Sequence, residues 1–166
     1  MAMFVPHGHK QPAVISILRH ANRFLLLKRN REPNFGCYTP VGGKLDPFET
    51  PSDAAIRETF EETGITISKP RYCGTLVDTS PTHYNWICFV YMADIDDISP
   101  PACDEGSLEW IEISEISTVS KPSTDEYLYD YVLRNEHFML SAQYDETMNM
   151  ILMKEEISGK TLYSAD

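Results

Sequence analysis

The sequence predicts an α/β protein, a sandwich in which helices pack around a mixed β-sheet. Stretches with a strand pattern outnumber stretches with a helix pattern, and strand runs separate the two helical stretches. At 166 residues the chain is long enough to bury one core without disulfides or structural metals. We therefore expect a single domain over residues 1–166, with its core between about residues 13 and 157 and flexible ends.

Strand-forming runs occur along the whole chain. Each is rich in apolar, β-branched or aromatic residues and is bounded by turn residues. They lie at 13–19, 24–29, 71–79, 85–94 and 108–113, and the runs FMLSAQYD and NMILMKEEI predict a final hairpin. Between them, 30–43 is predicted as a loop with a short strand at 37–40, and the polar stretch 94–107 as a second loop.

Two stretches have the pattern of helices. In the first, Thr50 fits an N-cap, Pro51 the first helical position, and Gly64 the C-terminal stop. The second runs from Ser123 to Arg134 and has apolar residues at helical spacing.

Charge is unevenly distributed over the chain. Residues 1–93 hold ten Lys/Arg and eight Asp/Glu, a net charge of +2, whereas residues 94–166 have a net charge of −13. This bias argues against polymeric nucleic acid as a partner. No apolar run is long enough for a membrane span, and the first residues lack the pattern of a signal peptide. We therefore expect a cytoplasmic protein with no membrane partner.

The one local concentration of basic residues precedes the first helix. Such a cluster fits either a solvated hairpin rim or a surface that faces phosphates, and the sequence leaves both open. Its members are Arg19, Arg23, Lys28, Arg29 and Arg31.

Three glutamates crowd into one face of the first helix. At about 100° per residue, Glu58, Glu61 and Glu62 fall within roughly 100° of arc. Ile56 and Phe60 fall on the opposite side, which we expect to be buried. A solvated acidic face would explain the cluster. However, carboxylates at this spacing repel one another unless something lies between them. Oxygen ligands of this kind suit a hard cation such as Mg²⁺ or Mn²⁺ that bridges to phosphates.

The spacing around this helix resembles the Nudix box, G-x5-E-x7-R-E-U-x-E-E-x-G-U. Gly43 and Glu49 occupy the first two fixed positions, and 57–65 reads RETFEETGI. The one departure is Thr59, where the family has a large aliphatic residue. Because Thr59 lies off the acidic face, the departure affects packing rather than chemistry.

The resemblance implies a Nudix-type α/β/α sandwich around a mixed sheet. Nudix enzymes hydrolyse a nucleoside diphosphate that is linked to another group. The resemblance also implies that Glu58, Glu61 and Glu62 bind the divalent metal, with the carbonyl of Gly42 as a further ligand. The expected cofactor is Mg²⁺, which Mn²⁺ can replace.

Two further positions follow from the resemblance. Arg57 and Glu49 are expected to form a pair that orients the acids of the helix; the alternative is an ordinary surface salt bridge, which would contribute little. Relatives also supply an acid from a downstream loop. Glu105, five residues before Trp110, is the candidate for an extra metal ligand or general base, with Asp104 as its competitor.

Beyond the box, the chain is similar to the MutT-type branch, particularly to bacterial 8-oxo-dGTP diphosphatases. The similar stretches are YTPVGGKLDPFETP, DEGSLEWIEISEI, KPSTDEYLYDYVL and HFMLSAQYD. The implied reaction is hydrolysis of a purine nucleoside triphosphate to the monophosphate and pyrophosphate, with a role in sanitation of the nucleotide pool and in DNA repair.

Candidate substrate-binding residues follow from this comparison. Asp125 lies where the branch reads the purine base, and its carboxylate can accept hydrogen bonds from N1–H and the exocyclic amine of guanine. The alternative for Asp125 is an acid that interacts with the helix dipole. Aromatic residues that can stack on a base or fill the core are Phe35, Tyr38 and Trp86. The predicted phosphate-binding and backbone contacts are Arg23, Lys28, Arg29, Gly43 and Lys44.

Two alternative functions stay open. The same fold can act on ADP-ribose, a dinucleoside polyphosphate or a nucleotide sugar; the SQPWPFP-like signature of NADH-cleaving relatives is absent. A Nudix module can also be a non-catalytic nucleotide sensor, although such proteins usually lose acids of the box and none is missing here. The expected oligomeric state is a monomer or a homodimer.

Overall fold

The computed structural model of the chain describes residues 4–166. Its helices are α1 (Pro51–Thr63) and α2 (Asp125–Leu133), with a short 3₁₀ helix η1 (Ile113–Glu115). Its strands are β1 (Gln11–His20), β2 (Arg23–Arg29), β3 (Tyr38–Thr39), β4 (Val41–Lys44), β5 (Arg71–Thr79), β6 (Trp86–Asp94), β7 (Ala102–Cys103), β8 (Gly106–Glu112), β9 (Phe138–Tyr144), β10 (Met150–Glu155) and β11 (Lys160–Ser164).

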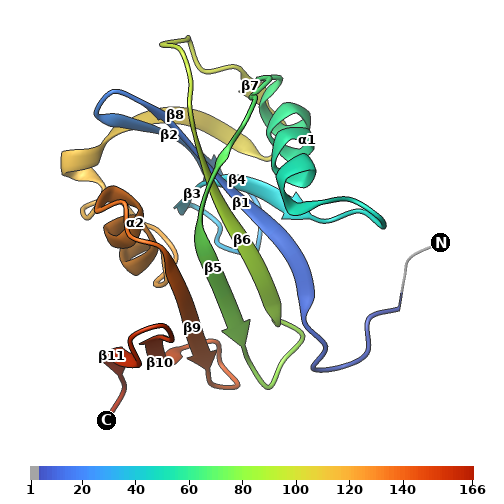
Figure 1. Cartoon of the computed structure of the whole chain (residues 1–166), viewed down its shortest axis with the longest axis vertical. Coiled ribbons are helices and arrows are strands. Elements are labelled where there is room, and N and C mark those ends of the chain that lie inside the picture. Colours follow the sequence, from blue (N-terminus) through green and yellow to red (C-terminus); the bar gives the residue numbers. More distant parts are fainter. Residues whose placement is uncertain (1–3) are drawn as a thin grey trace.

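The strands of the described residues form one mixed sheet. Its order is β11-β10-β9-β5-β6-β1-β2-β8-β7, with β3 paired to β2 and β4 paired to β1 (Figure 1). The pairs β1–β6 and β5–β9 are parallel, and the other pairs are antiparallel. The predicted mixed sheet is therefore confirmed.

The two helices cover opposite faces of this sheet. Side chains alternate along a strand, so neighbouring residues of β1 belong to different cores. Ile17 lies in the core that α2 covers, whereas Val14 packs with Ala54 and Ala55 of α1. Figure 1 shows α1 and α2 on either side of the central strands. The α/β/α sandwich predicted from the sequence is the observed architecture.

Helix α1 begins and ends where the sequence predicts. The Thr50 side chain accepts a hydrogen bond from the backbone N–H of Asp53, at 3.2 Å, and Pro51 occupies the first turn. Gly64 ends the helix in the left-handed conformation, with a φ of 71°, and its N–H donates to the Phe60 carbonyl.

The predicted buried face of α1 is wrong. Phe60 is 55% exposed and Ile56 is only partly buried. The buried residues are instead small: Ala54, Ala55, Thr59 and Thr63. Small side chains allow the helix to lie close to β1 and to the glycines of β4, and an aromatic ring would not fit in that contact. Close approach of the helix, rather than hydrophobicity, selects the buried residues here.

Several short elements were not predicted. Strand β4 begins within the predicted loop 30–43, and β7 lies within the predicted loop 94–107. The 3₁₀ helix η1 and the edge strand β11 had no sequence prediction. Helix α2 is shorter at both ends than the predicted 123–134, since residues 123, 124 and 134 are not helical. None of the helices in residues 4–166 is long and apolar enough to cross a membrane.

Candidate active site

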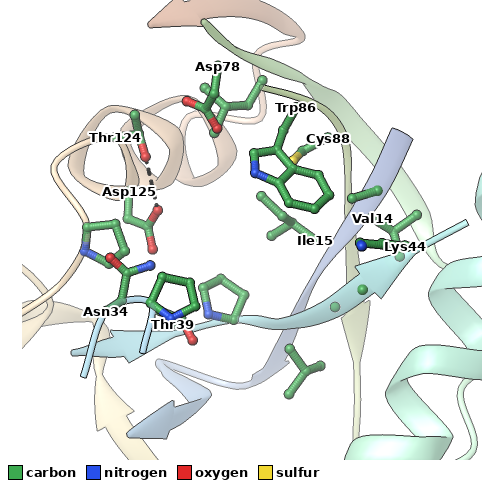
Figure 2. Close-up of a pocket in the computed structure, with 18 of the residues that line it drawn as sticks. Val14, Ile15, Asn34, Thr39, Lys44, Asp78, Trp86, Cys88, Thr124 and Asp125 are labelled. Atoms are coloured by element: carbon green, nitrogen blue, oxygen red, sulfur yellow. Dashed lines mark hydrogen bonds between the residues drawn. The ribbon is translucent and has the colours of Figure 1, made fainter. Parts of the chain in front are cut away.

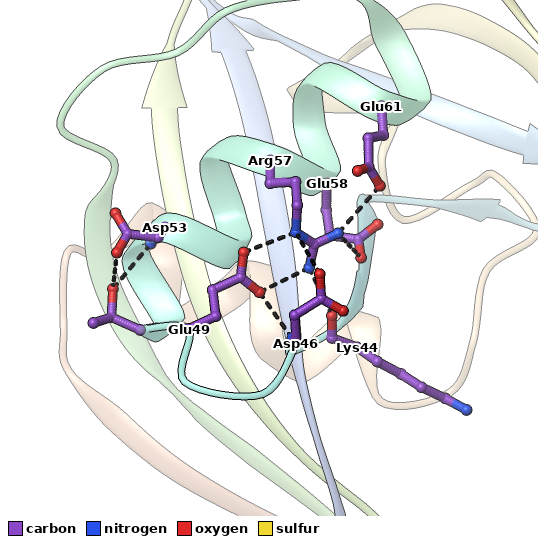
Figure 3. Close-up of polar contacts among 8 residues, drawn as sticks. Lys44, Asp46, Glu49, Asp53, Arg57, Glu58 and Glu61 are labelled. Atoms are coloured by element: carbon purple, nitrogen blue, oxygen red, sulfur yellow. Dashed lines mark hydrogen bonds and ion pairs between the residues drawn. The ribbon is translucent and has the colours of Figure 1, made fainter. Parts of the chain in front are cut away.

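Arg57 is the centre of an ion-pair network below α1 (Figure 3). Its Nε and Nη2 donate to the two carboxylate oxygens of Glu49, at 2.7 and 2.8 Å, and Nη2 also donates to the Lys44 carbonyl at 3.0 Å. Glu49 accepts a further hydrogen bond from the backbone N–H of Asp46. The hydrogen bonds from Arg57 lower the pKa of Glu49 to about 2. The bidentate pair ties the loop before α1 to the middle of the helix.

The same guanidinium contacts two of the three helix acids. Arg57 Nη1 lies 2.7 Å from Glu58 Oε1 and 3.1 Å from Glu61 Oε2. Since Glu49 fixes the other side of the guanidinium, the positions of Glu58 and Glu61 depend on the Arg57–Glu49 pair. The orienting role of this pair stays a prediction, and these contacts are the geometry that it requires.

Two glycines make room for this arrangement. A side chain at Gly42 would collide with the backbone carbonyl of Val14 on the neighbouring strand β1, and one at Gly43 would collide with the carboxylate of Glu58. The sheet therefore requires the first glycine, and the position of the helix acid requires the second.

Glu62 lies in the most crowded part of the acidic cluster. Its Oε2 accepts a hydrogen bond from the backbone N–H of Gly42 at 3.3 Å. Burial, with a smaller contribution from the charges of Glu105 and Glu58, raises the pKa of Glu62 to about 7, although the Gly42 hydrogen bond acts in the opposite direction. Burial is therefore the main cost of ionising Glu62, and neighbouring carboxylates add to it.

Glu105 reaches this cluster from the turn between β7 and β8. Its carboxylate lies 3.5 Å from Arg29 Nη1 and 3.6 Å from Arg31 Nη2. Its competitor Asp104 contributes its backbone carbonyl, which accepts hydrogen bonds from Asn30 and Arg31. Of the two acids in this turn, it is Glu105 whose charge acts on Glu62.

The donors of the cluster fit a divalent cation. They are all oxygen atoms, and Glu62 is an acid whose pKa is raised mainly by burial, so a hard cation bound beside it would favour its ionised form. Within residues 4–166, however, no three acidic, His or Cys side chains already converge as a metal site. Two of the acids are instead paired with Arg57. The residues available to such a cation are Glu58, Glu61, Glu62, Glu105 and the carbonyl of Gly42.

A cavity of about 330 Å³ opens beside the glycines of β4 (Figure 2). Its walls come from β1, β4, β5, β6 and the start of α2, and Trp86 supplies an aromatic face. Asp125 at the N-terminus of α2 lines it and is 95% buried. Thr124 Oγ1 donates to Asp125 Oδ1 at 3.4 Å, whereas Oδ2 has no partner among the described residues. Burial and the charge of Asp78 raise the pKa of Asp125 to about 7.

The structure brings some of the predicted substrate-binding residues to this cavity. They are Arg29, Gly43, Lys44 and Asp125, together with the aromatic candidate Trp86. Lys44 Nζ lies 5.7 Å from the centre of the Trp86 ring.

Other predicted residues lie elsewhere. Arg23 is at the opposite end of β2 from Arg29, where it pairs with Asp97 at 2.9 Å and lies over Trp110. Lys28 and Tyr38 face away from the cavity because side chains alternate along β2 and its partner β3. The Lys28 ammonium lies over the Tyr38 ring, and the Tyr38 hydroxyl donates to Glu109 at 2.7 Å. We therefore do not retain these three residues as substrate contacts.

Sequence reasoning missed part of the cavity wall. Asn34, Thr39, Tyr84 and Asp78 line it, and none was a candidate. For Asp78 there was a signal, since it is an acidic residue in the otherwise apolar strand run RYCGTLVDT. A buried acid in such a strand requires a compensating partner or a function.

Comparison with known proteins identifies the family. Residues 9–133, most of the chain, match the family model described as the NUDIX domain. The chain is a Nudix hydrolase. The resemblance read from the box is thereby confirmed, and members of this family generally use divalent metal ions such as Mg²⁺ or Mn²⁺.

This Nudix hydrolase is similar to curated relatives and to solved structures. It is 28% identical over 125 residues to the uncharacterized Nudix hydrolase YvcI of Bacillus subtilis, covering 72% of this chain and 77% of that one. It is 30% identical over 115 residues to the NAD-capped RNA hydrolase NudC of Vibrio parahaemolyticus, covering 68% of this chain but only 43% of NudC. The MutT protein of Bacillus halodurans has the same fold, with a TM-score of 0.78 at 22% identity over 89% of this chain and 98% of that one.

Proposed function

We propose that this Nudix hydrolase cleaves a purine nucleoside triphosphate, such as 8-oxo-dGTP, to the monophosphate and pyrophosphate. One observation carries the proposal: strand β4 borders both the acidic face of α1 and the cavity in which one buried oxygen of Asp125 has no partner among the described residues. A base in the cavity would direct its phosphates along Gly42 and Gly43 toward the glutamates.

Asp125 is the proposed base-reading residue. Its free oxygen Oδ2 is buried, so it is costly to leave without a hydrogen-bond donor. A guanine-type base offers N1–H and an exocyclic amine on one edge, which a carboxylate can accept together. Trp86 offers a face for stacking, and its position in the cavity favours it over Tyr38.

The phosphates are proposed to lie against the basic and backbone groups at the cavity mouth. Lys44 and Arg29 line this mouth, and the bare backbone of Gly43 allows close approach of an anion. Arg29 is held in place by its hydrogen bond to the Pro33 carbonyl at 2.7 Å.

The acidic cluster is proposed to bind the divalent metal through Glu58, Glu61, Glu62, Glu105 and the Gly42 carbonyl. A cation bound there would neutralise phosphate charge and lower the pKa of a water molecule. The Arg57–Glu49 pair orients two of these acids, and Arg29 with Arg31 orients Glu105. The proton of the attacking water passes to one of three carboxylates: Glu58, Glu61 or Glu105.

The test is a substrate panel with and without Mg²⁺, in which released pyrophosphate and monophosphate are measured. We expect Mg²⁺-dependent pyrophosphate release from a purine triphosphate. Glu61→Gln and Glu62→Gln should each lower kcat by about a hundredfold or more, since each removes a charge the metal needs while keeping the side-chain size.

The matched control for these variants is Glu146→Gln, an exposed acid in the loop between β9 and β10. It should retain full activity. If turnover with Mg²⁺ stays within tenfold of wild type in both active-site variants, the proposed metal site is wrong.

A second candidate function is hydrolysis of a nucleotide diphosphate conjugate, such as NAD-capped RNA, ADP-ribose, a dinucleoside polyphosphate or a nucleotide sugar. Its support is the 30% identity to NudC, although this chain spans less than half of that protein and lacks the SQPWPFP-like signature. Monophosphate release from conjugates without pyrophosphate release from triphosphates would favour it. Nucleotide binding without any hydrolysis would favour a sensor. DNA repair and a cytoplasmic location stay predictions.

A further inference from the structure

A second buried carboxylate lines the cavity, and the proposed function does not use it. Asp78 lies near the end of β5, opposite Trp86 on β6 and Ala142 on β9. It is 2% exposed. Its Oδ1 accepts a hydrogen bond from the Tyr144 hydroxyl at 3.0 Å, and no residue of the described chain donates to Oδ2.

Lys10 lies beside Asp78 but does not form an ion pair with its carboxylate. The Lys10 ammonium donates to the backbone carbonyl of Asp78 and to the side chains of Thr79 and Asn85, and it makes no hydrogen bond to the Asp78 carboxylate. A buried carboxylate with one neutral donor costs free energy that the fold could avoid with an amide or an apolar residue. Within residues 4–166, therefore, the surroundings do not explain why an acid is present at this position.

Asp78 and Asp125 face one cavity from different walls. Figure 2 shows the two carboxylates beside the same opening, with the Trp86 ring across from Asp125. Each has one oxygen without a donor from the described chain. Ionised carboxylates only accept hydrogen bonds, so a ligand that satisfies both must bring several N–H groups. Adenine, hypoxanthine and the pyrimidines each offer fewer donors on one edge than guanine, which has N1–H and both hydrogens of its amine.

We propose that Asp78 is a second specificity-determining residue of this cavity, which accepts one hydrogen of the exocyclic amine of a guanine-type base while Asp125 accepts N1–H and the other. This inference rests on the proposed function, because it assigns the base of the same substrate. Under this proposal, the enzyme distinguishes guanine-type bases from other bases by their exocyclic amine.

The test compares dGTP with dITP, whose base lacks only the exocyclic amine. We expect wild type to prefer dGTP in kcat/KM by roughly tenfold to a hundredfold. In Asp78→Asn the amide oxygen can still accept the hydrogen bond from the Tyr144 hydroxyl, which leaves the NH₂ group facing the exocyclic amine of the base. Two donors would then face each other and could not form a hydrogen bond. The ratio of dGTP to dITP should fall by about tenfold or more, with dITP turnover largely retained.

Asp94→Asn is the matched control. Asp94 is an exposed acid at the end of β6 that pairs with Arg19, and it does not line the cavity. This variant should keep the wild-type ratio. A dGTP-to-dITP ratio in Asp78→Asn within threefold of wild type would overturn the inference.

A second variant and a second measurement keep the test decisive. If Asp78→Asn does not fold, as judged by circular dichroism, Tyr144→Phe takes its place, because it removes the donor that orients Asp78. It should lower the ratio in the same direction by a smaller factor, and an unchanged ratio would refute the inference.

Metal-free calorimetry of dGMP and dIMP tests the amine preference without turnover. Absence of triphosphate hydrolysis would refute the proposed function, whereas equal affinities for dGMP and dIMP would refute the role of Asp78.

Discussion

Three acidic side chains of this protein lie where burial disfavours their ionised form. Glu62 on α1 and the cavity residues Asp78 and Asp125 are carboxyl groups whose pKa burial raises, to about 7, 6 and 7. In each case the protein leaves the acid without a compensating cation close enough to restore a normal pKa. Such sites are typical of places where a ligand or metal supplies the missing partner.

The raised pKa of Asp125 predicts a pH dependence of stability. A carboxyl whose folded pKa lies above its unfolded value contributes stability that is complete below about pH 4 and is lost as pH rises through about 7. The groups around it are the acid Asp78, the cation Lys121 and the hydroxyl of Thr124. Asp125→Asn should remove this dependence, so the variant should gain stability relative to wild type by about 1–3 kcal/mol from pH 5 to pH 8.

Urea unfolding of ligand-free wild type and Asp125→Asn at the two pH values measures this difference. Asp130→Asn, an exposed acid later in the same helix, is the control and should follow wild type. Parallel stability curves for wild type and Asp125→Asn would contradict the proposed burial of an ionisable group.

At the scale of elements, helix α1 and strand β4 act as one unit. The strand provides the two glycines, and the helix provides the acids that lie against them. Small residues on the inner face of α1 allow this contact. The Arg57–Glu49 pair then ties the connecting loop to the helix. The geometry of the acidic cluster therefore depends on how closely these two elements pack.

The surroundings of Gly42 and Gly43 predict different outcomes for an alanine substitution at each position. Gly42→Ala should lower the free energy of unfolding by roughly 2 kcal/mol or more, because the new methyl group meets the rigid backbone of β1. Gly43→Ala meets only the carboxylate end of the Glu58 side chain, so it should change stability by less than about 1 kcal/mol and yet displace that acid.

Urea unfolding and Mg²⁺-dependent turnover, measured on both variants, separate the two effects. We expect Gly43→Ala to lose at least about tenfold in kcat while it stays folded. Full activity of Gly43→Ala would show that the position of Glu58 is not critical.

At the scale of the whole molecule, the C-terminal strands complete the core. The matched family region ends at residue 133, yet β9 pairs in parallel with the central strand β5. Phe138, Leu140, Ala142 and Met153 are almost fully buried. In contrast, most residues of the edge strand β11 are exposed. The core therefore extends through β10 but depends little on β11.

Truncation tests this distribution of stability. A chain that ends at residue 159, before β11, should fold, with a Tm within about 8 °C of wild type, since little apolar surface is lost. A chain that ends at Arg134 removes β9 and β10 and should not fold cooperatively. Thermal melts followed by circular dichroism distinguish the two. Cooperative folding of the shorter chain would show that β9 and β10 are not part of the core.

The sequence by itself determined the features that depend on local spacing. The Nudix box, the boundaries of α1 and the runs that become β1, β2, β5, β6 and β8 all follow from residues close together in the chain. The acids on one face of α1 also follow from helical spacing alone. For this reason the family and the fold class were predicted correctly.

Only the tertiary structure decided which residues meet at the cavity. The order β9-β5-β6-β1 brings Tyr144 to Asp78, and the β2–β8 pairing brings Glu105 to Arg29, while Arg23 lies at the far end of the same strand. It also decided that Thr59 rather than Phe60 is buried, because α1 packs close to β4. These contacts join residues distant in the sequence, so no local pattern of hydrophobicity or charge encodes them.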